Sequence, residues 1–151
     1  MVYQAFLGKL IRRGRKAYAR SVLDVLCFKI KGFFKVCSGR VFLEDLFLEH
    51  RLLLGFAMKR FGARKLALAV PIKRKTGLCR ALTIFFRAVS ERSERLLVER
   101  LFFEVVDLSF SRGKSYVALG QYYESLAKNR PFVKTFKRFG GNKKRRRSFF
   151  Y

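Results

Sequence analysis

The residues of this chain whose types and spacing best suit a chemical task are lysines and arginines, gathered in blocks that contain no acid. Residues 1 to 20 hold six basic residues and no acid, and residues 55 to 80 hold eight basic residues and no acid. Ammonium and guanidinium groups neutralise phosphates and release their counterions, and the guanidinium fork adds paired hydrogen bonds. The blocks therefore predict a polyanionic partner.

The candidate contact residues fall into two blocks and one lesser group. The first block supplies Lys9, Arg12, Arg13, Arg15, Lys16 and Arg20. The second supplies Lys59, Arg60, Arg64, Lys65, Lys73, Arg74 and Lys75, and the lesser candidates are Arg92 and Arg95. For any single residue, a solvated surface base is nearly as good an interpretation. The prediction therefore depends on the blocks.

The distribution of charge along the chain gives more information than its total. The formal net charge is +25, yet eight of the ten acids lie within residues 44–49 and 91–107. Such segregation predicts one basic face on the folded molecule. Because net charge this large destabilises a compact state by self-repulsion, we expect a neutralising partner. Nucleic acid is the first choice and an anionic membrane surface the second.

Residues that could support catalysis are scarce. His50 is the only histidine, and no second metal ligand stands at a recognisable spacing from it. The Gly-Lys-Ser run at 113–115 resembles the end of a phosphate-binding loop, but Leu108 stands where that motif needs glycine. The acids of 91–107 alternate with arginines, as on a salt-bridged helix surface. We therefore expect no enzyme activity, no metal and no cofactor.

The elements that position these residues are predicted to be mainly α-helical, in a bundle of about six helices with one protruding basic β-hairpin. A single domain over residues 1–139 would be followed by a basic tail at 140–151, which contains the run 143–147. Helical spacing of apolar residues predicts two helices within 3–31, joined at Gly14. Further helices are predicted over 41–54, 76–91, 93–110 and 116–128, with a last short one after Pro131 through residue 139.

Two details of this layout concern the ends and faces of the predicted elements. Residues 32–40 contain two glycines and predict a connection between helices. Ser93 predicts the N-cap of the helix over 93–110. In that helix Leu97 and Leu101 fall on the core side, whereas Glu99, Arg100 and Glu104 fall on the solvent side.

A hairpin is predicted at about residues 55–72. Two runs that mix apolar and basic residues, 56–60 and 65–70, flank Phe61, Gly62 and Ala63, and Pro71 closes the second run. This places an aromatic ring between basic residues at the tip, where it could contact RNA. Packing of Phe61 into a core is the competing interpretation.

Several segments resemble the universal small-subunit ribosomal protein seven family. The ungapped stretch Arg80 to Arg95 is similar to the family's block Ala-Leu … Glu-Ala-Ala-Arg-Lys-Arg, and Leu126 to Phe132 to its closing Ala-Asn-x-x-Phe element. Phe6 to Lys16 resembles the family's opening helix, while Lys59 to Ala63 and Ala69 to Ile72 look like the arms of its hairpin. The likeness spans roughly residues 6–139. It departs from the family at residues 117–120, in the missing basic arm before the first helix and in the missing terminal tryptophan.

The resemblance implies a structural protein in the head of the small ribosomal subunit. It would bind and organise the 3′ domain of the small-subunit rRNA, beside neighbouring head and platform proteins. The hairpin tip Phe61-Gly62-Ala63 would lie near the mRNA path and the exit-site tRNA. The phenylalanine content, the divergence and the lack of a targeting sequence favour an organelle-encoded member in the mitochondrial matrix.

The alternative is a peripheral membrane protein that binds anionic lipid through basic amphipathic helices. It would expose bulky apolar residues opposite its bases. The longest apolar runs, such as 52–58, are much shorter than the ~20 residues of a spanning helix, so we expect no membrane-spanning segment.

Overall fold

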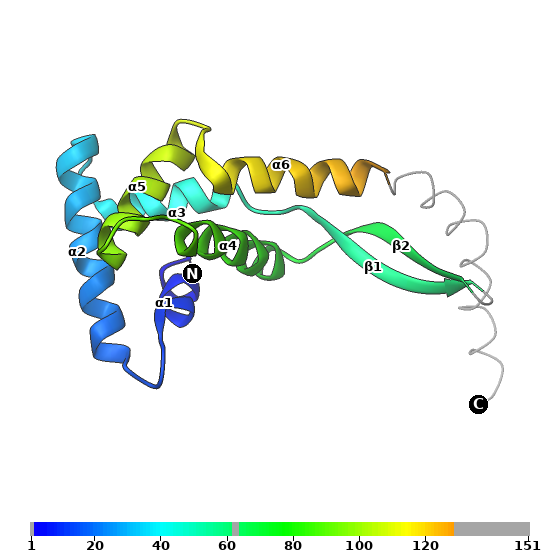
Figure 1. The fold of residues 1–151 in the computed structure, drawn as a ribbon, viewed down its shortest axis with the longest axis horizontal. Coiled ribbons are helices and arrows are strands. Elements are labelled where there is room, and N and C mark those ends of the chain that lie inside the picture. The colour runs from blue at the N-terminus through cyan, green and yellow to red at the C-terminus, as the bar shows by residue number, and fades with distance from the viewer. Residues whose placement is uncertain (1, 62–63, 129–151) are drawn as a thin grey trace, which may run out of the picture.

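The computed structural model describes residues 2–61 and 64–128, which are mainly helical with one antiparallel hairpin (Figure 1). In chain order the elements are α1 Val2–Leu10, α2 Lys16–Phe34, α3 Gly39–Glu49, β1 Leu54–Phe61, β2 Arg64–Pro71, α4 Arg74–Ser90, α5 Leu97–Ser109 and α6 Gly113–Lys128. The predicted fold class is therefore confirmed. The predicted hairpin residues Gly62 and Ala63, the last helix through 139 and the tail at 140–151 lie outside the described residues.

Three phenylalanines from distant parts of the chain form the centre of the core. Phe6 of α1, Phe47 of α3 and Phe85 of α4 are all almost completely buried. Their ring centroids are 5.6 Å apart for Phe6 and Phe47 and 5.1 Å apart for Phe47 and Phe85, both edge to face. Such aromatic pairs contribute about 0.5–1.5 kcal/mol beyond the area that they bury. They hold α1, α3 and α4 together.

The joint predicted at Gly14 is confirmed, but the connection predicted over 32–40 is too long. Helix α2 continues through Phe34, and only residues 35–38 separate it from α3. Packing explains the extension, because Ile30 is fully buried and the Phe34 ring stacks on Phe42 of α3, with centroids 4.5 Å apart. Lys35, with φ +52°, ends the helix in the left-handed region.

The predicted N-cap at Ser93 is wrong, because α5 begins at Leu97 with Leu96 in the N-cap position. The segment between α4 and α5 is therefore longer than predicted. Within it, Arg92 forms ion pairs with Glu94 and with Glu104 of α5. Two assignments of faces on α5 also change. Glu104 is fully buried instead of solvated, and Leu97, predicted to face the core, is partly exposed.

The hairpin extends to one side of the helical body (Figure 1), and its base is held by α6. Its antiparallel register runs from the pair Leu54–Pro71 to the pair Phe61–Arg64. An isolated two-stranded ribbon is marginally stable in water, but here the Phe56 ring lies edge to face on Tyr122 of α6, with centroids 5.4 Å apart. The side chains of Lys59, Phe61 and residues 64 to 66 lie outside the described part.

Gly113 combines a left-handed backbone conformation with a close side-chain neighbour. Its φ is +86°, and an added Cβ would lie 2.8 Å from the Asp107 Cβ. We expect Gly113→Ala to lower the free energy of unfolding by about 1–3 kcal/mol. The matched control is Gly120→Ala in α6, where an added Cβ meets nothing within 4 Å and should stabilise the helix by about 0.5–1 kcal/mol. Urea denaturation of both variants checks this, and equal midpoints would contradict it.

Candidate nucleic-acid interface

The ends of several elements enclose a cleft of about 630 Å³ that we name the basic cleft. It lies where the turn between α1 and α2 meets the end of α4 and the start of α5. Its lining residues are Lys9, Leu10, Arg12, Arg13, Arg15, Tyr18, Phe86, Val89, Ser90, Arg95, Leu97 and Arg100. Six of them are cationic and none is acidic. The first predicted block therefore meets one of the lesser candidates, Arg95, in three dimensions.

A tight turn brings the arginines of the first block to the cleft. Two successive residues, Arg13 with φ +51° and Gly14 with φ +72°, lie in the left-handed region. The turn is closed by hydrogen bonds from the Arg15 amide to the Arg12 carbonyl, 3.1 Å, and from the Lys16 amide to the Gly14 carbonyl, 2.8 Å. A left-handed conformation is unfavourable for a side chain such as that of Arg13, and this kind of strain concentrates at functional sites.

The N-terminal ends of α2 and α4 have an unusual charge. Lys16 opens α2 after Arg15, Arg74 opens α4 after Lys73, and neither first turn contains an acid. A cation at this end opposes the helix dipole, typically by about 0.3–1 kcal/mol. An external phosphate would reverse the sign, because helix N-termini and cations both attract anions. Both helix starts are therefore better suited to a bound polyanion than to free solution.

The second predicted block lies apart from the basic cleft. Lys73, Arg74 and Lys75 are exposed at the start of α4, beside the base of the hairpin, and Arg60 is exposed on β1. The cleft lies at the other end of α4, and a helix of this length spans about 25 Å. The two groups of basic residues would thus contact separate positions on any long polyanion. Arg20 and Lys16 are exposed on α2, next to the cleft-lining part of that helix.

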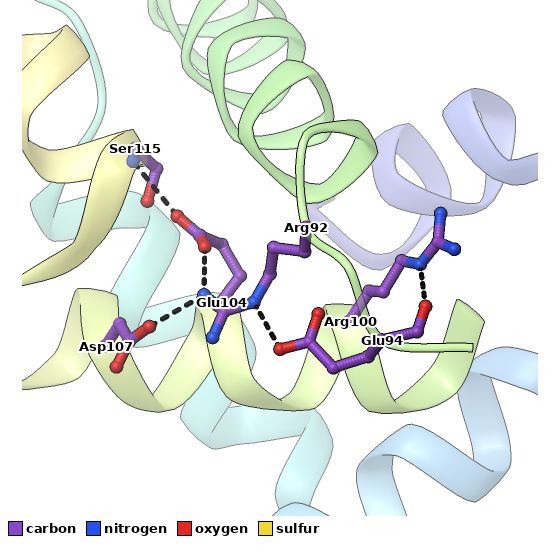
Figure 2. Close-up of polar contacts among 6 residues, drawn as sticks. All are labelled: Arg92, Glu94, Arg100, Glu104, Asp107 and Ser115. Carbon is purple, nitrogen blue, oxygen red and sulfur yellow. Dashed lines mark hydrogen bonds and ion pairs between the residues drawn. The ribbon is translucent and has the colours of Figure 1, made fainter. Parts of the chain in front are cut away.

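Arg92 differs from the other candidates because it is engaged within the chain (Figure 2). Its Nη1 donates to Glu104 Oε2 at 2.5 Å and to Asp107 Oδ2 at 2.7 Å, and its Nε donates to Glu94 Oε1 at 3.0 Å. Partial burial lowers the pKa of Arg92. The hydrogen bonds to these carboxylates raise the pKa by more than burial lowers it, so the net shift is upward. We call this set the Arg92 network and leave Arg92 out of the proposed interface.

The Arg92 network positions one wall of the basic cleft. Glu104 also accepts a hydrogen bond from the Ser115 amide at 3.0 Å, which ties α5 to the start of α6. On the other side of the same connection, Arg100 Nε donates to the carbonyl oxygen of Glu94 (Figure 2). The segment that carries Arg95 is therefore held at both ends. Arg95 remains exposed at the cleft.

The cleft contains functional candidates that the sequence did not single out. Tyr18 is 61% exposed at the cleft and places an aromatic ring among the arginines. Its position between basic residues in the sequence is a weak signal, because RNA-binding surfaces often alternate aromatic and basic side chains. Arg100 gave no such signal, because its pattern matched a salt-bridged helix surface. Only the packing of the α1–α2 turn against the start of α5 makes it part of the site.

A second groove, between α4 and α6, is less suited to a polyanion. It is larger, about 770 Å³, and contains Arg87 and Lys114, but Glu91 also lines it. Lys114 Nζ lies 3.6 Å from the Glu91 carboxylate, so this cation already has an anionic partner. The basic cleft is therefore the better candidate.

The described residues also bear on metal binding and on membrane crossing. Among residues 2–61 and 64–128, no group of three or more His, Cys, Asp or Glu side chains could hold a metal ion. The Nδ1 of His50 lies 3.0 Å from the Leu46 carbonyl oxygen. In the same part of the chain, none of the helices combines the length and the apolar character that crossing a membrane requires.

No family model matches this chain, and no curated protein matches its sequence.

Proposed function

We propose that this protein is a non-catalytic structural component of the small ribosomal subunit, where it binds and organises the 3′ domain, or head, of the small-subunit rRNA. The observation that carries the proposal is the basic cleft, in which six cations from three separate segments meet without an acid. Neutralisation of phosphates supplies affinity, and the fixed shape of the cleft supplies selectivity for folded RNA.

The cleft suits an RNA segment with an unpaired base. Arg12, Arg13 and Arg95 bind phosphates, and the exposed Tyr18 ring stacks on a base that leaves the helix. Double-helical RNA hides its major-groove base edges, so a curved basic surface next to a stacking ring recognises shape more than sequence. Lys73, Arg74 and Lys75 add a second contact at the far end of α4.

The place within the ribosome follows from the resemblance to the small-subunit ribosomal protein seven family. By that resemblance the hairpin, with Phe61, Gly62 and Ala63 at its tip, points toward the mRNA path and the exit-site tRNA. Other head and platform proteins are the neighbours. The mitochondrial matrix is the proposed location, with an organelle-encoded chain.

A peripheral membrane protein is the second candidate, and one observation favours it. Phe28 and Phe33 of α2 are 78% and 56% exposed, as binding of bulky apolar side chains to lipid would require. Against it, both residues line a groove that also contains the acid Glu99. Anionic headgroups would repel this carboxylate, so we favour RNA as the partner of the basic surface.

Sedimentation of native small subunits tests the proposed function. We expect the tagged full-length protein to remain with small subunits after a high-salt wash. The cleft variant Arg12→Ala/Arg13→Ala/Arg95→Ala should appear mostly in the supernatant. A control that removes three exposed cations elsewhere, Lys29→Ala/Lys31→Ala/Lys35→Ala, should stay with the subunits. Recovery of the tagged wild-type protein in a membrane pellet, together with small subunits that lack it, would overturn the proposal.

A further inference from the structure

The side chains that line the basic cleft offer hydrogen-bond donors almost exclusively. Its six cationic side chains donate hydrogen bonds but cannot accept them, and the lining contains no carboxylate. Among the lining side chains, only the hydroxyls of Tyr18 and Ser90 can accept. The Ser90 hydroxyl itself donates to the Phe86 carbonyl at 2.9 Å. A ligand that fills this cleft therefore has to supply acceptors.

The main chain around the cleft adds few acceptors, because its carbonyls already have donors. In the α1–α2 turn, the carbonyls of Arg12 and Gly14 each accept a hydrogen bond from a main-chain amide. In the segment between α4 and α5, the Glu94 carbonyl accepts from Arg100 Nε, and the Leu96 carbonyl accepts from a main-chain amide. The cleft is thus rich in donors and poor in acceptors.

Of the four RNA bases, guanine has the edge that best suits such a surface. Its O6 and N7 are adjacent acceptors, and a guanidinium fork donates to both at once. Adenine carries an amino donor in place of O6, cytosine presents an amino donor, and uracil presents one carbonyl on that edge. An amino group that faces a guanidinium has no acceptor, and a donor left unpaired in a binding site lowers the affinity. The cleft therefore favours guanine.

Arg95 is the arginine best suited to recognise the guanine edge. It is exposed in the part of the lining that the α4–α5 segment contributes, and its side chain has no partner among residues 2–61 and 64–128. Arg100 lines the same part, but its Nε is engaged by the Glu94 carbonyl, so its fork is incomplete. The Arg92 network holds the segment in place. A complete fork on a fixed main chain loses less entropy when it binds.

The apolar part of the lining accommodates the flat faces of a nucleotide base. The exposed Tyr18 ring belongs to the same cleft as Leu10, Phe86 and Leu97. The cleft volume of about 630 Å³ lies within the range of roughly 300–1,000 Å³ of sites that enclose small ligands. A whole nucleotide therefore fits, and the cations of the α1–α2 turn remain available for phosphates.

We propose that the basic cleft binds a guanosine that leaves an RNA helix, and that Arg95 recognises its base. This inference rests on the RNA binding proposed above and adds the identity of one nucleotide. The Arg95 guanidinium donates to O6 and N7, the Tyr18 ring stacks on the base, and the cations of the α1–α2 turn bind the neighbouring phosphates. A protein that otherwise recognises RNA by shape thus reads the sequence at one position.

Fluorescence anisotropy with the full-length protein tests the preference for guanine. The probes are labelled RNA hairpins that differ only in one bulged nucleotide, which is G, A, U or C. We expect the bulged G to bind at least about tenfold more tightly than the bulged A. A bulged 7-deazaguanosine, which has carbon in place of N7, should lose most of this advantage. Equal affinities for the four hairpins, with a steep salt dependence, reject guanine recognition and leave the proposed RNA binding intact. Failure to bind any hairpin rejects both.

Arg95→Lys separates the fork from the charge. Lysine keeps the positive charge, so the salt dependence should match that of the wild type, whereas the preference for G over A should fall to about twofold or less. The matched control Arg12→Lys should keep the full preference. A preference that survives in Arg95→Lys, or that is lost equally in both variants, overturns the role of Arg95.

Guanosine monophosphate as a competitor distinguishes RNA from a free nucleotide as the source of the guanine. We expect no displacement of the bulged-G hairpin by an equal concentration of the mononucleotide, because the hairpin also provides phosphates on both sides of the bulge. Displacement at equal concentration would overturn the proposal, since the cleft would then bind a free nucleotide.

Discussion

Glu104→Ala is expected to lower the free energy of unfolding by about 3 kcal/mol, because it leaves the mostly buried Arg92 without its closest carboxylate. Glu104 is fully buried and accepts hydrogen bonds from Arg92 and from the Ser115 amide. Loss of the carboxylate thus leaves two donors without this acceptor, and each buried unsatisfied donor carries a desolvation cost of about 1–3 kcal/mol. Urea denaturation followed by circular dichroism measures the change.

Three further variants separate the charge of Glu104 from its hydrogen bonds and its packing. Glu104→Gln keeps the volume and an acceptor for the Ser115 amide, so we expect a smaller loss, and it is informative even if the alanine variant fails to fold. Asp107→Ala, at a carboxylate whose side chain is 38% exposed, should cost about 1 kcal/mol or less. The double variant Arg92→Met/Glu104→Leu should recover most of the stability, because apolar residues often replace a buried ion pair without loss. Equal midpoints for Glu104→Ala and the wild type would refute the structural role of the network.

The helices and the hairpin could be predicted from the sequence because their signals are local. The spacing of Phe6, Leu7 and Leu10, the break at Gly14, and the turn between two mixed runs ending at Pro71 each depend on a few neighbouring residues. The fold class follows from such signals with little help from tertiary contacts. Boundaries were less accurate where distant packing decides them, as at Phe34, whose ring stacks on α3.

The candidate site depends on contacts that no local pattern encodes. Arg92 and Arg95 stand three residues apart in one acidic and basic run, yet the first is engaged by three carboxylates and the second is exposed at the basic cleft. The helical pattern of α5 assigned Glu104 to solvent because it could not show that the segment after α4 folds back over that face. The same limit concealed Arg100, which becomes part of the cleft only through the α1–α2 turn.

The basic cleft predicts a steep and specific dependence of RNA affinity on salt. If the wild-type protein neutralises six or more phosphates, its affinity for 3′-domain RNA should fall by roughly 10³-fold or more between about 50 and 200 mM salt. Arg12→Ala/Arg13→Ala/Arg95→Ala removes up to three of these contacts. The slope of log affinity against log salt should then become shallower by about 2, since each phosphate contributes about 0.7–0.9. Filter binding at several salt concentrations gives both slopes.

Tyr18→Ala distinguishes stacking from charge within the same cleft. Removing the ring should weaken binding by about 1–3 kcal/mol at every salt concentration, because base stacking releases no counterion, and the slope should match that of the wild type. The lysine control Lys29→Ala/Lys31→Ala/Lys35→Ala removes as many charges as the arginine variant but lies outside the cleft, so its slope should change less. A salt-independent wild-type affinity would refute the electrostatic mechanism. Equal slopes for the arginine and lysine variants would instead show that the total charge of +25, and not its convergence at the cleft, determines binding.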